Sequence, residues 1–248
     1  MVDWLFAPIE STRAHEVGVW VSWHGRLMVL AWGVLLPLGV LIARYFKIMP
    51  GQDWPREVDN RIWWHSHLTL QYSGGVATLV ALVLIFWAPR TGTAGNVHIV
   101  LGWVVAGLAC LQFLSGWLRG SKGGPTDASP DGSLAGDHYD MTLRRRVFEH
   151  FHKSAGYVLV LLALAAVVTG MWLANALVWM WVGLAGWWAV LGVAFVVLHR
   201  RGLTIDTYQA IWGPDRRHPG NTVKPIGWGV RRREDVPKPD GVDNAAYH

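Results

Sequence analysis

The sequence contains little cysteine and little charge. One of its 248 residues is a cysteine, Cys110, and 16% are charged, whereas a typical soluble domain is about 25% charged. A single cysteine excludes a disulfide framework, a cysteine-ligated iron–sulfur cluster and a cysteine-rich zinc site. The absence of a C-x-x-C-H motif also excludes covalently attached c-type haem. Hydrophobic residues make up 52% of the chain and 17 residues are tryptophan, which predicts an integral membrane protein rather than a soluble enzyme.

Five apolar runs are long enough to cross a bilayer, which takes about 20 residues of helix. None of them alternates in the way that a barrel strand does, so all five are predicted to be helices. The expected fold is an all-α integral membrane protein with a four-helix core and one peripheral helix. The five transmembrane helices are expected at residues 19–43, 65–87, 96–118, 152–174 and 176–198.

These spans divide the chain into three parts. Residues 1–18 form a short N-terminal segment, residues 19–198 the membrane domain, and residues 199–248 a basic, Pro-rich tail. Within the tail, residues 204–212 are predicted to form a short interfacial helix. The glycine-rich stretch 120–136, between the third and fourth spans, is predicted to be a flexible loop.

Basic residues are distributed unequally between the two ends of the expected bundle. If the spans alternate in direction, the loops after the first and third spans, the adjoining helix ends and the tail hold 19 of the 22 Lys and Arg residues. The positive-inside rule therefore places this end, with the C-terminus, in the cytoplasm and the N-terminus on the periplasmic or outer side. Residues 1–18 contain no basic region followed by an apolar stretch, so no cleavable signal is expected.

Four of the 11 histidines lie just inside the expected helix starts. An ionisable residue inside a span is costly and usually functional. Alternating spans place His24 and His98 near the outer surface, and His67 and His152 near the inner surface. One pair at each face is the arrangement expected for two bis-histidine b-type haems, because a haem iron takes axial ligands from opposite sides and neutral imidazole suits it. The core of a four-helix bundle is a common place for such a site.

Glycines near these histidines fit a flat macrocycle. Gly102 follows His98 by four residues and Gly156 follows His152 by four, and residues four apart lie on one helix face. Each glycine is therefore expected to leave room beside a ligand. Gly74 and Gly75 are expected to do the same in the second span.

Other interpretations of the histidines remain open. A lone histidine at a membrane interface is more often a hydrogen-bonded interfacial residue than a ligand, so a structural membrane protein without a cofactor is an alternative. Zinc is a competing metal, although two histidines without a nearby thiolate or carboxylate suit it poorly. His65 and His150 each precede a candidate ligand by two residues, which turns them toward a different helix face.

Several short motifs occur in order along the four core spans. The first carries His24-Gly25, Trp32-Gly33 and Pro37-Leu38-Gly39; the second Trp63-Trp64-His65-Ser66-His67 with Gln71; the third His98, Leu101-Gly102 and Leu111-Gln112; and the fourth Phe148 and His150-Phe151-His152-Lys153-Ser154-Ala155-Gly156-Tyr157. By these motifs the chain resembles the cytochrome b561 family, especially the membrane half of DOMON–cytochrome proteins and their bacterial relatives. The resemblance covers about residues 20–200.

The resemblance implies haem ligation by His24 with His98 and by His67 with His152, which is also the pairing that depth predicts. It implies two non-covalent haem b groups and electron transfer across a membrane, often from cytoplasmic ascorbate to an external acceptor such as ferric iron. No DOMON domain is expected before the first span, and no ascorbate site maps onto the loops.

A quinol, another small-molecule reductant or a protein donor is therefore an equal candidate, with the protein in a bacterial inner membrane. The alternative function is a haem-bearing subunit of a larger dehydrogenase, respiratory or photosynthetic complex that exchanges electrons with quinone. Membrane lipid is an expected partner, and nucleic acid is not.

Cationic side chains near the helix ends are candidates to pair with haem propionates, since guanidinium and ammonium groups bind carboxylates. Arg26 and Lys153 are the principal candidates. Arg44, Arg61 and the run 144–146 fit equally well as anchors to anionic headgroups. Gln71 and Gln112 are candidates to hydrogen-bond a ligand or to join helices.

Overall fold

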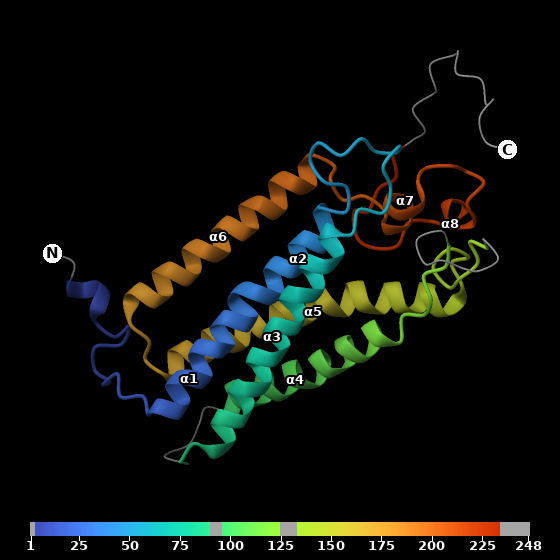
Figure 1. Cartoon of the computed structure of the whole chain (residues 1–248). Coiled ribbons are helices and arrows are strands. Elements are labelled where there is room, and N and C mark those ends of the chain that lie inside the picture. Colours follow the sequence, from blue (N-terminus) through green and yellow to red (C-terminus); the bar gives the residue numbers. More distant parts are fainter. Residues whose placement is uncertain (1–2, 90–95, 125–132, 234–248) are drawn as a thin grey trace.

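A computed structural model describes residues 3–89, 96–124 and 133–233 of the chain (Figure 1). Five helices in it are long and apolar enough to cross a membrane. They are Val19–Tyr45, which comprises α1 (Val19–Met28), η2 (Val29–Leu35) and α2 (Leu36–Tyr45), followed by α3 (Ile62–Trp87), α4 (Asn96–Trp117), α5 (Leu143–Leu173) and α6 (Val178–Arg200). The described residues contain no β-strand, only two isolated bridges. The predicted all-α, five-span membrane fold is confirmed.

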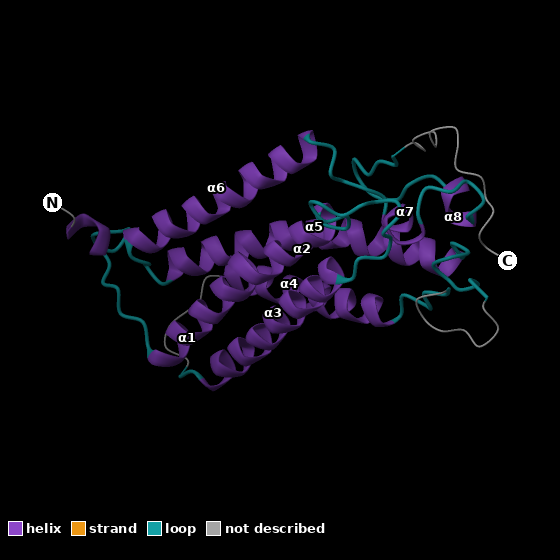
Figure 2. Cartoon of the chain, turned by 45° about the horizontal axis from the view of Figure 1, so that its top comes forward, coloured by secondary structure: helices purple, strands orange, loops and turns teal. Residues whose placement is uncertain are grey.

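The first four spans form the bundle, and α6 lies along its side (Figures 1 and 2). The bundle core is apolar and includes Trp32, Leu36, Leu159 and Ala163. No residue of α6 is buried, so the prediction of one peripheral helix is confirmed. One end of the bundle carries the N-terminal segment, and the other carries the long loops and the tail.

The fourth span begins earlier than hydropathy predicts. Helix α5 starts at Leu143, nine residues before the expected start at His152. Thr142 caps it, because its hydroxyl accepts a hydrogen bond from the backbone N–H of Arg145 at 3.4 Å. The first turns are charged and project beyond the apolar run, so the hydropathy marks the membrane-embedded part and not the helix. His152 consequently lies well inside a helix.

A π-helical segment, η2, interrupts the first span at Val29–Leu35. Such segments are rare and disturb the regular hydrogen-bond ladder. Here the carbonyl of Gly33 accepts hydrogen bonds from the indole N–H groups of Trp187 and Trp188 on α6, each at 3.1 Å. The segment therefore gives the peripheral helix a polar attachment to the bundle.

The N-terminal segment closes over the turn between α5 and α6. Asn175, in the left-handed region with φ 48°, accepts from the N–H of Glu10 and donates to the carbonyls of Glu10 and Arg13. The backbone of Val178 donates to the carbonyl of Ala7 at 3.0 Å. We call this arrangement of residues 7–15 around the turn the clasp.

The tail folds against the opposite end of the bundle as far as Arg233. It contains two short helices, α7 (Thr207–Trp212) and α8 (Pro219–Thr222). We call residues 204–233 the tail cap. The prediction of an interfacial helix is wrong in one respect: every residue of α7 is buried, because Tyr208, Ile211 and Trp212 pack with Trp63 and Met141 beneath the loops.

Arg232, one of the basic residues of the tail, lies inside the tail cap. Its guanidinium binds the carboxylate of Asp206 at 2.9 Å and the carbonyls of Gly220, Asn221 and Val223. The middle of the predicted flexible loop 120–136 and the last part of the tail lie outside the described residues.

Candidate functional site

The four candidate histidines form two pairs. His24 on α1 faces His98 on α4, with ring centroids 6.4 Å apart and planes at 88°. His67 on α3 faces His152 on α5, with ring centroids 6.5 Å apart and planes at 83°. We call these the first pair and the second pair. The structure thus brings together the residues that depth in the membrane predicts to be partners.

All four imidazoles are oriented by a hydrogen bond at Nδ1. In three of them Nδ1 donates to a backbone carbonyl: His24 to Ala81 at 2.9 Å, His67 to Gly39 at 3.0 Å and His98 to Ala166 at 3.0 Å. Because a carbonyl can only accept, Nδ1 carries the proton and Nε2 keeps its lone pair. This is the arrangement that metal-bound histidines show.

In the fourth histidine, His152, Nδ1 donates to a hydroxyl group instead of a backbone carbonyl. Ser115 donates its proton to the carbonyl of Gln112 at 2.8 Å, so it accepts from Nδ1 of His152 at 3.1 Å. None of the four Nε2 atoms forms a hydrogen bond with a residue that the structure describes.

The spacing of each pair fits one metal ion between two rings. Two opposed imidazoles bonded to one metal at about 2.0 Å per nitrogen hold their centroids about 6 Å apart. No group of three or more His, Cys, Asp or Glu side chains suited to a metal occurs among the described residues. Zinc, which takes three or four protein ligands, therefore fits poorly, whereas a haem iron needs only two axial ligands.

The two pairs lie at opposite ends of the bundle. Ala81, which orients His24, follows His67 on α3 by 14 residues, and Ala166, which orients His98, follows His152 on α5 by 14 residues. At 1.5 Å per residue both intervals correspond to about 21 Å along the helices. The space between the pairs is filled by the apolar core around Trp32 and Leu36.

The glycines behave in two ways. A Cβ on Gly102 would meet nothing within 4 Å, and one on Gly156 would meet only Gln112 at 3.7 Å, so both positions are open; that this space accommodates a macrocycle beside a ligand stays a prediction. At Gly74 and Gly75 the prediction is wrong. A Cβ there would approach Leu36 to 2.7 Å and Phe113 to 2.8 Å, so these glycines permit close helix packing.

Sequence reasoning missed Gly170 on α5. A Cβ at this position would lie 2.8 Å from Cε1 of His98. Only glycine allows the ring of His98 to lie against α5, yet nothing near Gly170 in the sequence points to a histidine on another helix.

The polar candidates have partners of their own. Gln71 donates to the carbonyl of Leu36 and Gln112 to that of His152, each at 3.2 Å, so both join helices. Lys153 binds Glu149 at 2.6 Å and the tail carbonyl of Ile226 at 2.8 Å. The guanidinium of Arg26 lies over the ring of Trp23 at 5.3 Å.

Two of the other basic candidates also have partners within the protein. Arg44 donates to the hydroxyl of Tyr157 and the carbonyl of Trp228, and Arg145 binds Glu149 at 2.9 Å. His65 and His150 are exposed, in keeping with their prediction as bystanders.

Two buried basic groups lie where the tail cap meets the bundle. Burial lowers the pKa of Lys47 to about 7, and its ammonium group donates to the carbonyl of Ile205 at 2.9 Å. Burial, assisted by the charge of Arg145, lowers the pKa of His138 to about 3. His138 is therefore neutral at physiological pH although Glu149 lies 3.7 Å away.

No protein-family model and no solved structure matches the chain. Curated proteins do match. A cytochrome b561, DM13 and DOMON domain-containing protein of Arabidopsis thaliana is 30% identical over 148 residues, which cover 60% of this chain and 14% of the relative. Ferric-chelate reductase 1 of Mus musculus is 32% identical over 155 residues, or 60% of this chain and 22% of the relative.

The chain is related to the cytochrome b561 family. A second Arabidopsis thaliana protein, named for its cytochrome b561 and DOMON domains, is 27% identical over 150 residues and 60% of this chain. The chain spans only a part of each of these proteins: among the first three it covers from 14% to 27% of their length.

Proposed function

We propose that this protein transfers electrons across a membrane through two b-type haems held only by histidine. His24 and His98 would ligate one haem, and His67 and His152 the other. The observation that carries the proposal is the repeated geometry of the pairs: centroids 6.4 and 6.5 Å apart, with every Nδ1 engaged in a hydrogen bond. The names of the relatives support it, because they include cytochromes b561 and ferric-chelate reductases.

The chain's own residues orient the ligands and exclude water. When bound, the haems supply reversible one-electron chemistry at iron. The carbonyls of Gly39, Ala81 and Ala166 and the hydroxyl of Ser115 fix each ring and raise the basicity of its Nε2. Gly102 and Gly156 leave space beside the ligands, and we propose that Arg26 and Lys153 contribute positive charge toward the propionates. The packed core between the pairs keeps water out of the region between them.

We propose that the end with the second pair and the tail faces the cytoplasm, because it holds 19 of the 22 basic residues. The N-terminal segment would then lie outside, and residues 199–248 would form a cytoplasmic tail. The expectation of a bacterial inner membrane gains no support from the relatives, which are plant and animal proteins. That the chain crosses a membrane several times is supported by its helices.

The redox partners belong to the same proposal. The ferric-chelate reductases suggest an iron acceptor, and ascorbate, quinol or a protein are candidate donors. The alternative function is a haem-bearing subunit of a larger respiratory, photosynthetic or dehydrogenase complex that exchanges electrons with quinone. An apolar groove beside the second pair, described below, favours exchange with a membrane-soluble carrier.

A reduced-minus-oxidised spectrum of the purified protein tests the proposal, together with a haem count. We expect a b-type α band and two haems per chain. His24→Ala and His98→Ala should remove the same spectral component, and His67→Ala and His152→Ala the other.

His65→Ala and His150→Ala are matched controls that should keep both components, because these exposed histidines lie two residues from the ligands. Absence of the α band from the purified protein would sink the haem proposal. Loss of haem in His65→Ala but not in His67→Ala would show that the ligand on α3 is misassigned.

A further inference from the structure

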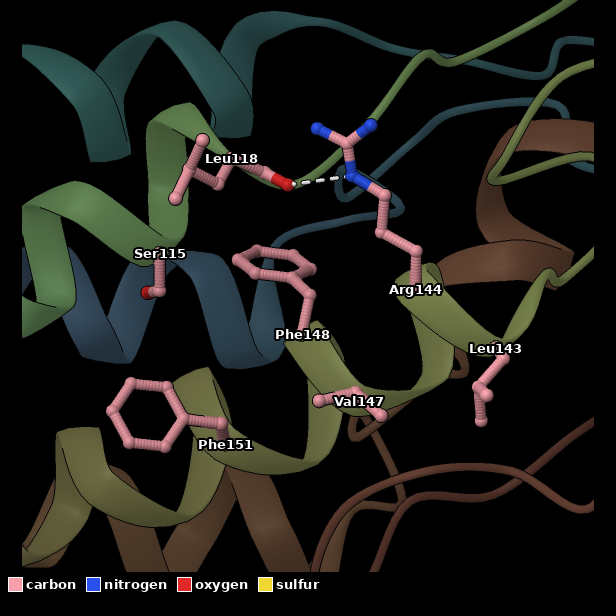
Figure 3. Close-up of a pocket in the computed structure, with 7 residues that line it drawn as sticks. All are labelled: Ser115, Leu118, Leu143, Arg144, Val147, Phe148 and Phe151. Atoms are coloured by element: carbon pink, nitrogen blue, oxygen red, sulfur yellow. Dashed lines mark hydrogen bonds between the residues drawn. The ribbon is translucent and has the colours of Figure 1, made fainter.

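A groove of about 670 Å³ lies between the end of α4 and the start of α5 (Figure 3). Pockets of 300–1,000 Å³ suit small molecules. Its rim opens on the outer surface of the bundle, where Leu118, Leu143 and Val147 are 63%, 69% and 59% exposed. These side chains lie at the end of the spans, beside the charged first turns of α5, so the groove would open where the bilayer meets water. Its lining is Ser115, Leu118, Leu143, Arg144, Val147, Phe148 and Phe151.

The groove reaches the second histidine pair. The ring of Phe148 lies 5.1 Å from that of His152, centroid to centroid, at an angle of 31°. Ser115, on the opposite wall, accepts the hydrogen bond from Nδ1 of His152. A molecule in the groove would be separated from the ligand imidazole by a single side chain.

The polar groups of the groove define what it can bind. A hydroxyl oxygen has one proton and two lone pairs. Ser115 gives its proton to Gln112 and uses one lone pair for His152, so its remaining capacity is that of an acceptor. Arg144 donates its Nε to the carbonyl of Leu118 at 3.0 Å, and a guanidinium carries five donors in all. The site therefore offers an acceptor on Ser115 and donors on Arg144, with Phe148 and Phe151 also in its lining.

We propose that this groove binds the ring of a lipid-soluble quinol, an inference that rests on the proposed haem at the second pair. One ring hydroxyl donates to Ser115, the ring packs on Phe148 and Phe151, and the second oxygen lies within reach of Arg144. The apolar tail leaves past Leu118 and Val147 into the bilayer. A phosphodiester headgroup accepts hydrogen bonds but does not donate them, so it leaves the lone pair of Ser115 unmatched.

The redox step balances with the groups already named. Oxidation of one quinol to quinone breaks two O–H bonds and releases two electrons and two protons. The two electrons would go to the haems proposed at the two histidine pairs, one each, and the protons would pass to water at the end of the bundle near Arg144. In the opposite direction the same site reduces quinone.

Photoaffinity labelling with an azidoquinone tests binding without relying on turnover. The full-length protein is reconstituted with its haems in phosphatidylcholine nanodiscs, illuminated and mapped by mass spectrometry. We expect labels within residues 115–118 and 143–151, and we expect excess decylubiquinol to prevent them. Labels spread over the lipid-facing helices that decylubiquinol does not displace would overturn the proposal and identify the groove as a lipid site.

Two groove-filling variants test the same site from opposite walls, each with a control nearby in the sequence. Val147→Trp on α5 pairs with Val158→Trp, because the two positions are eleven residues apart on nearly the same exposed face. Leu118→Trp, directly after the end of α4, pairs with Leu111→Trp on α4, seven residues earlier. The groove-filling variants should raise the decylubiquinol concentration needed for half-maximal haem reduction on the order of tenfold, which is about 1.4 kcal/mol of binding, and the controls should leave it unchanged.

Dithionite-reduced spectra separate this proposal from the one on which it rests. Two haems per chain without displaceable labelling, or with Val147→Trp and Leu118→Trp both reacting like wild type, would leave the haem proposal standing and remove the quinol site. Absence of haem from wild type would instead remove the proposed function, whereas labelling can be scored in either case.

Discussion

The two ends of the bundle hold histidine pairs of nearly the same geometry in different surroundings. The first pair lies near the clasp, where Asn175 and short backbone contacts close the structure. The second pair lies near the tail cap, where Lys47, Arg145, Glu149 and Lys153 form a charged layer. The ligand pairs are thus alike, whereas charge, cover and access differ.

The cavities beside the two pairs also differ in volume. A cavity of about 330 Å³ beside the first pair includes His98 itself, while the groove beside the second pair is about twice as large. If each pair holds a haem as proposed, the pair provides the ligands, whereas redox potential and partner choice depend on its surroundings. We therefore expect a mutation in the surroundings of one pair to affect that end of the bundle more than the other.

Gly170→Ala is expected to separate the two histidine pairs by a large difference in haem binding. The added Cβ would meet His98 at 2.8 Å, and overpacking of this kind costs about 1–3 kcal/mol. We expect the first haem to bind on the order of tenfold or more weakly, with the second haem retained. Haem titration followed by spectra of the two components measures the effect.

Gly107→Ala on α4 is the control for that substitution. A Cβ there meets nothing within 4 Å, so the variant should keep both haems and gain up to about 1 kcal/mol of helix stability. Equal retention of both haems in Gly170→Ala would show that close contact with α5 does not position His98.

Arg232→Ala should loosen the tail cap without disturbing the clasp. It removes the hydrogen bonds to three carbonyls and leaves the buried carboxylate of Asp206 without its partner. The expected cost is about 3 kcal/mol of local stability, seen as faster cleavage within residues 204–233 by a non-specific protease.

The matched control lies in the same tail. Arg217 pairs with Asp215 at the surface with its side chain 89% exposed, so Arg217→Ala should cost less than about 1 kcal/mol. Similar protease sensitivity in the two variants would mean that the internal bonds of Arg232 do not hold the cap.

The sequence predicts which histidines lie opposite each other because each candidate ligand interrupts an apolar run. His24, His67, His98 and His152 are conspicuous inside spans, and alternating threading alone assigns them to two ends. The groups that accept the hydrogen bonds from the imidazoles could not be predicted in the same way. Three of the four are backbone carbonyls, of Gly39, Ala81 and Ala166, and a carbonyl has no side-chain signature.

The boundaries and the cap were less predictable for physical reasons. Hydropathy finds the apolar run of α5 but not its charged first turns. There the cap by Thr142 and the ion pair of Arg145 with Glu149 stabilise the helix. The fold of the tail depends on contacts such as Arg232 with Asp206, which are 26 residues apart. Likewise, Gly170 matters only because another helix brings His98 to it.

Acidification should loosen the tail cap before the clasp. His138 has its pKa lowered from 6.5 to about 3 by burial and by Arg145, with Lys122 and Lys153 also nearby and Glu149 acting in the opposite direction. Between these values the unfolded chain binds a proton that the folded cap does not, so stability falls as pH falls below 6.5. For Lys47 the loss occurs earlier, between its ordinary 10.5 and about 7.

Protease protection measured from pH 8 to pH 5 checks this expectation. Protection of residues 204–233 should fall, and His138→Leu should flatten the part of the curve below pH 6.5. The clasp residues 7–15 include no buried basic side chain, so their protection should stay constant. A cap that is equally protected at pH 8 and pH 5 would contradict the assigned burial of His138.

The smallest expected effect is electrostatic and concerns Lys153. A positive charge favours the reduced form of a nearby iron, so Lys153→Gln should lower the potential of the second haem. One charge at about 10 Å in an effective dielectric constant near 20 contributes roughly 1–2 kcal/mol, or tens of millivolts, before the opposing charge of Glu149 reduces it. Arg146→Gln removes the same charge from an exposed position on the same helix, where water and salt screen it, and should shift the potential less. Spectroelectrochemical titration measures both haems in one sample, and the first haem serves as the internal reference because it lies about 21 Å away along the helices. A shift of the first haem as large as that of the second would mean that the charged layer does not distinguish the two ends.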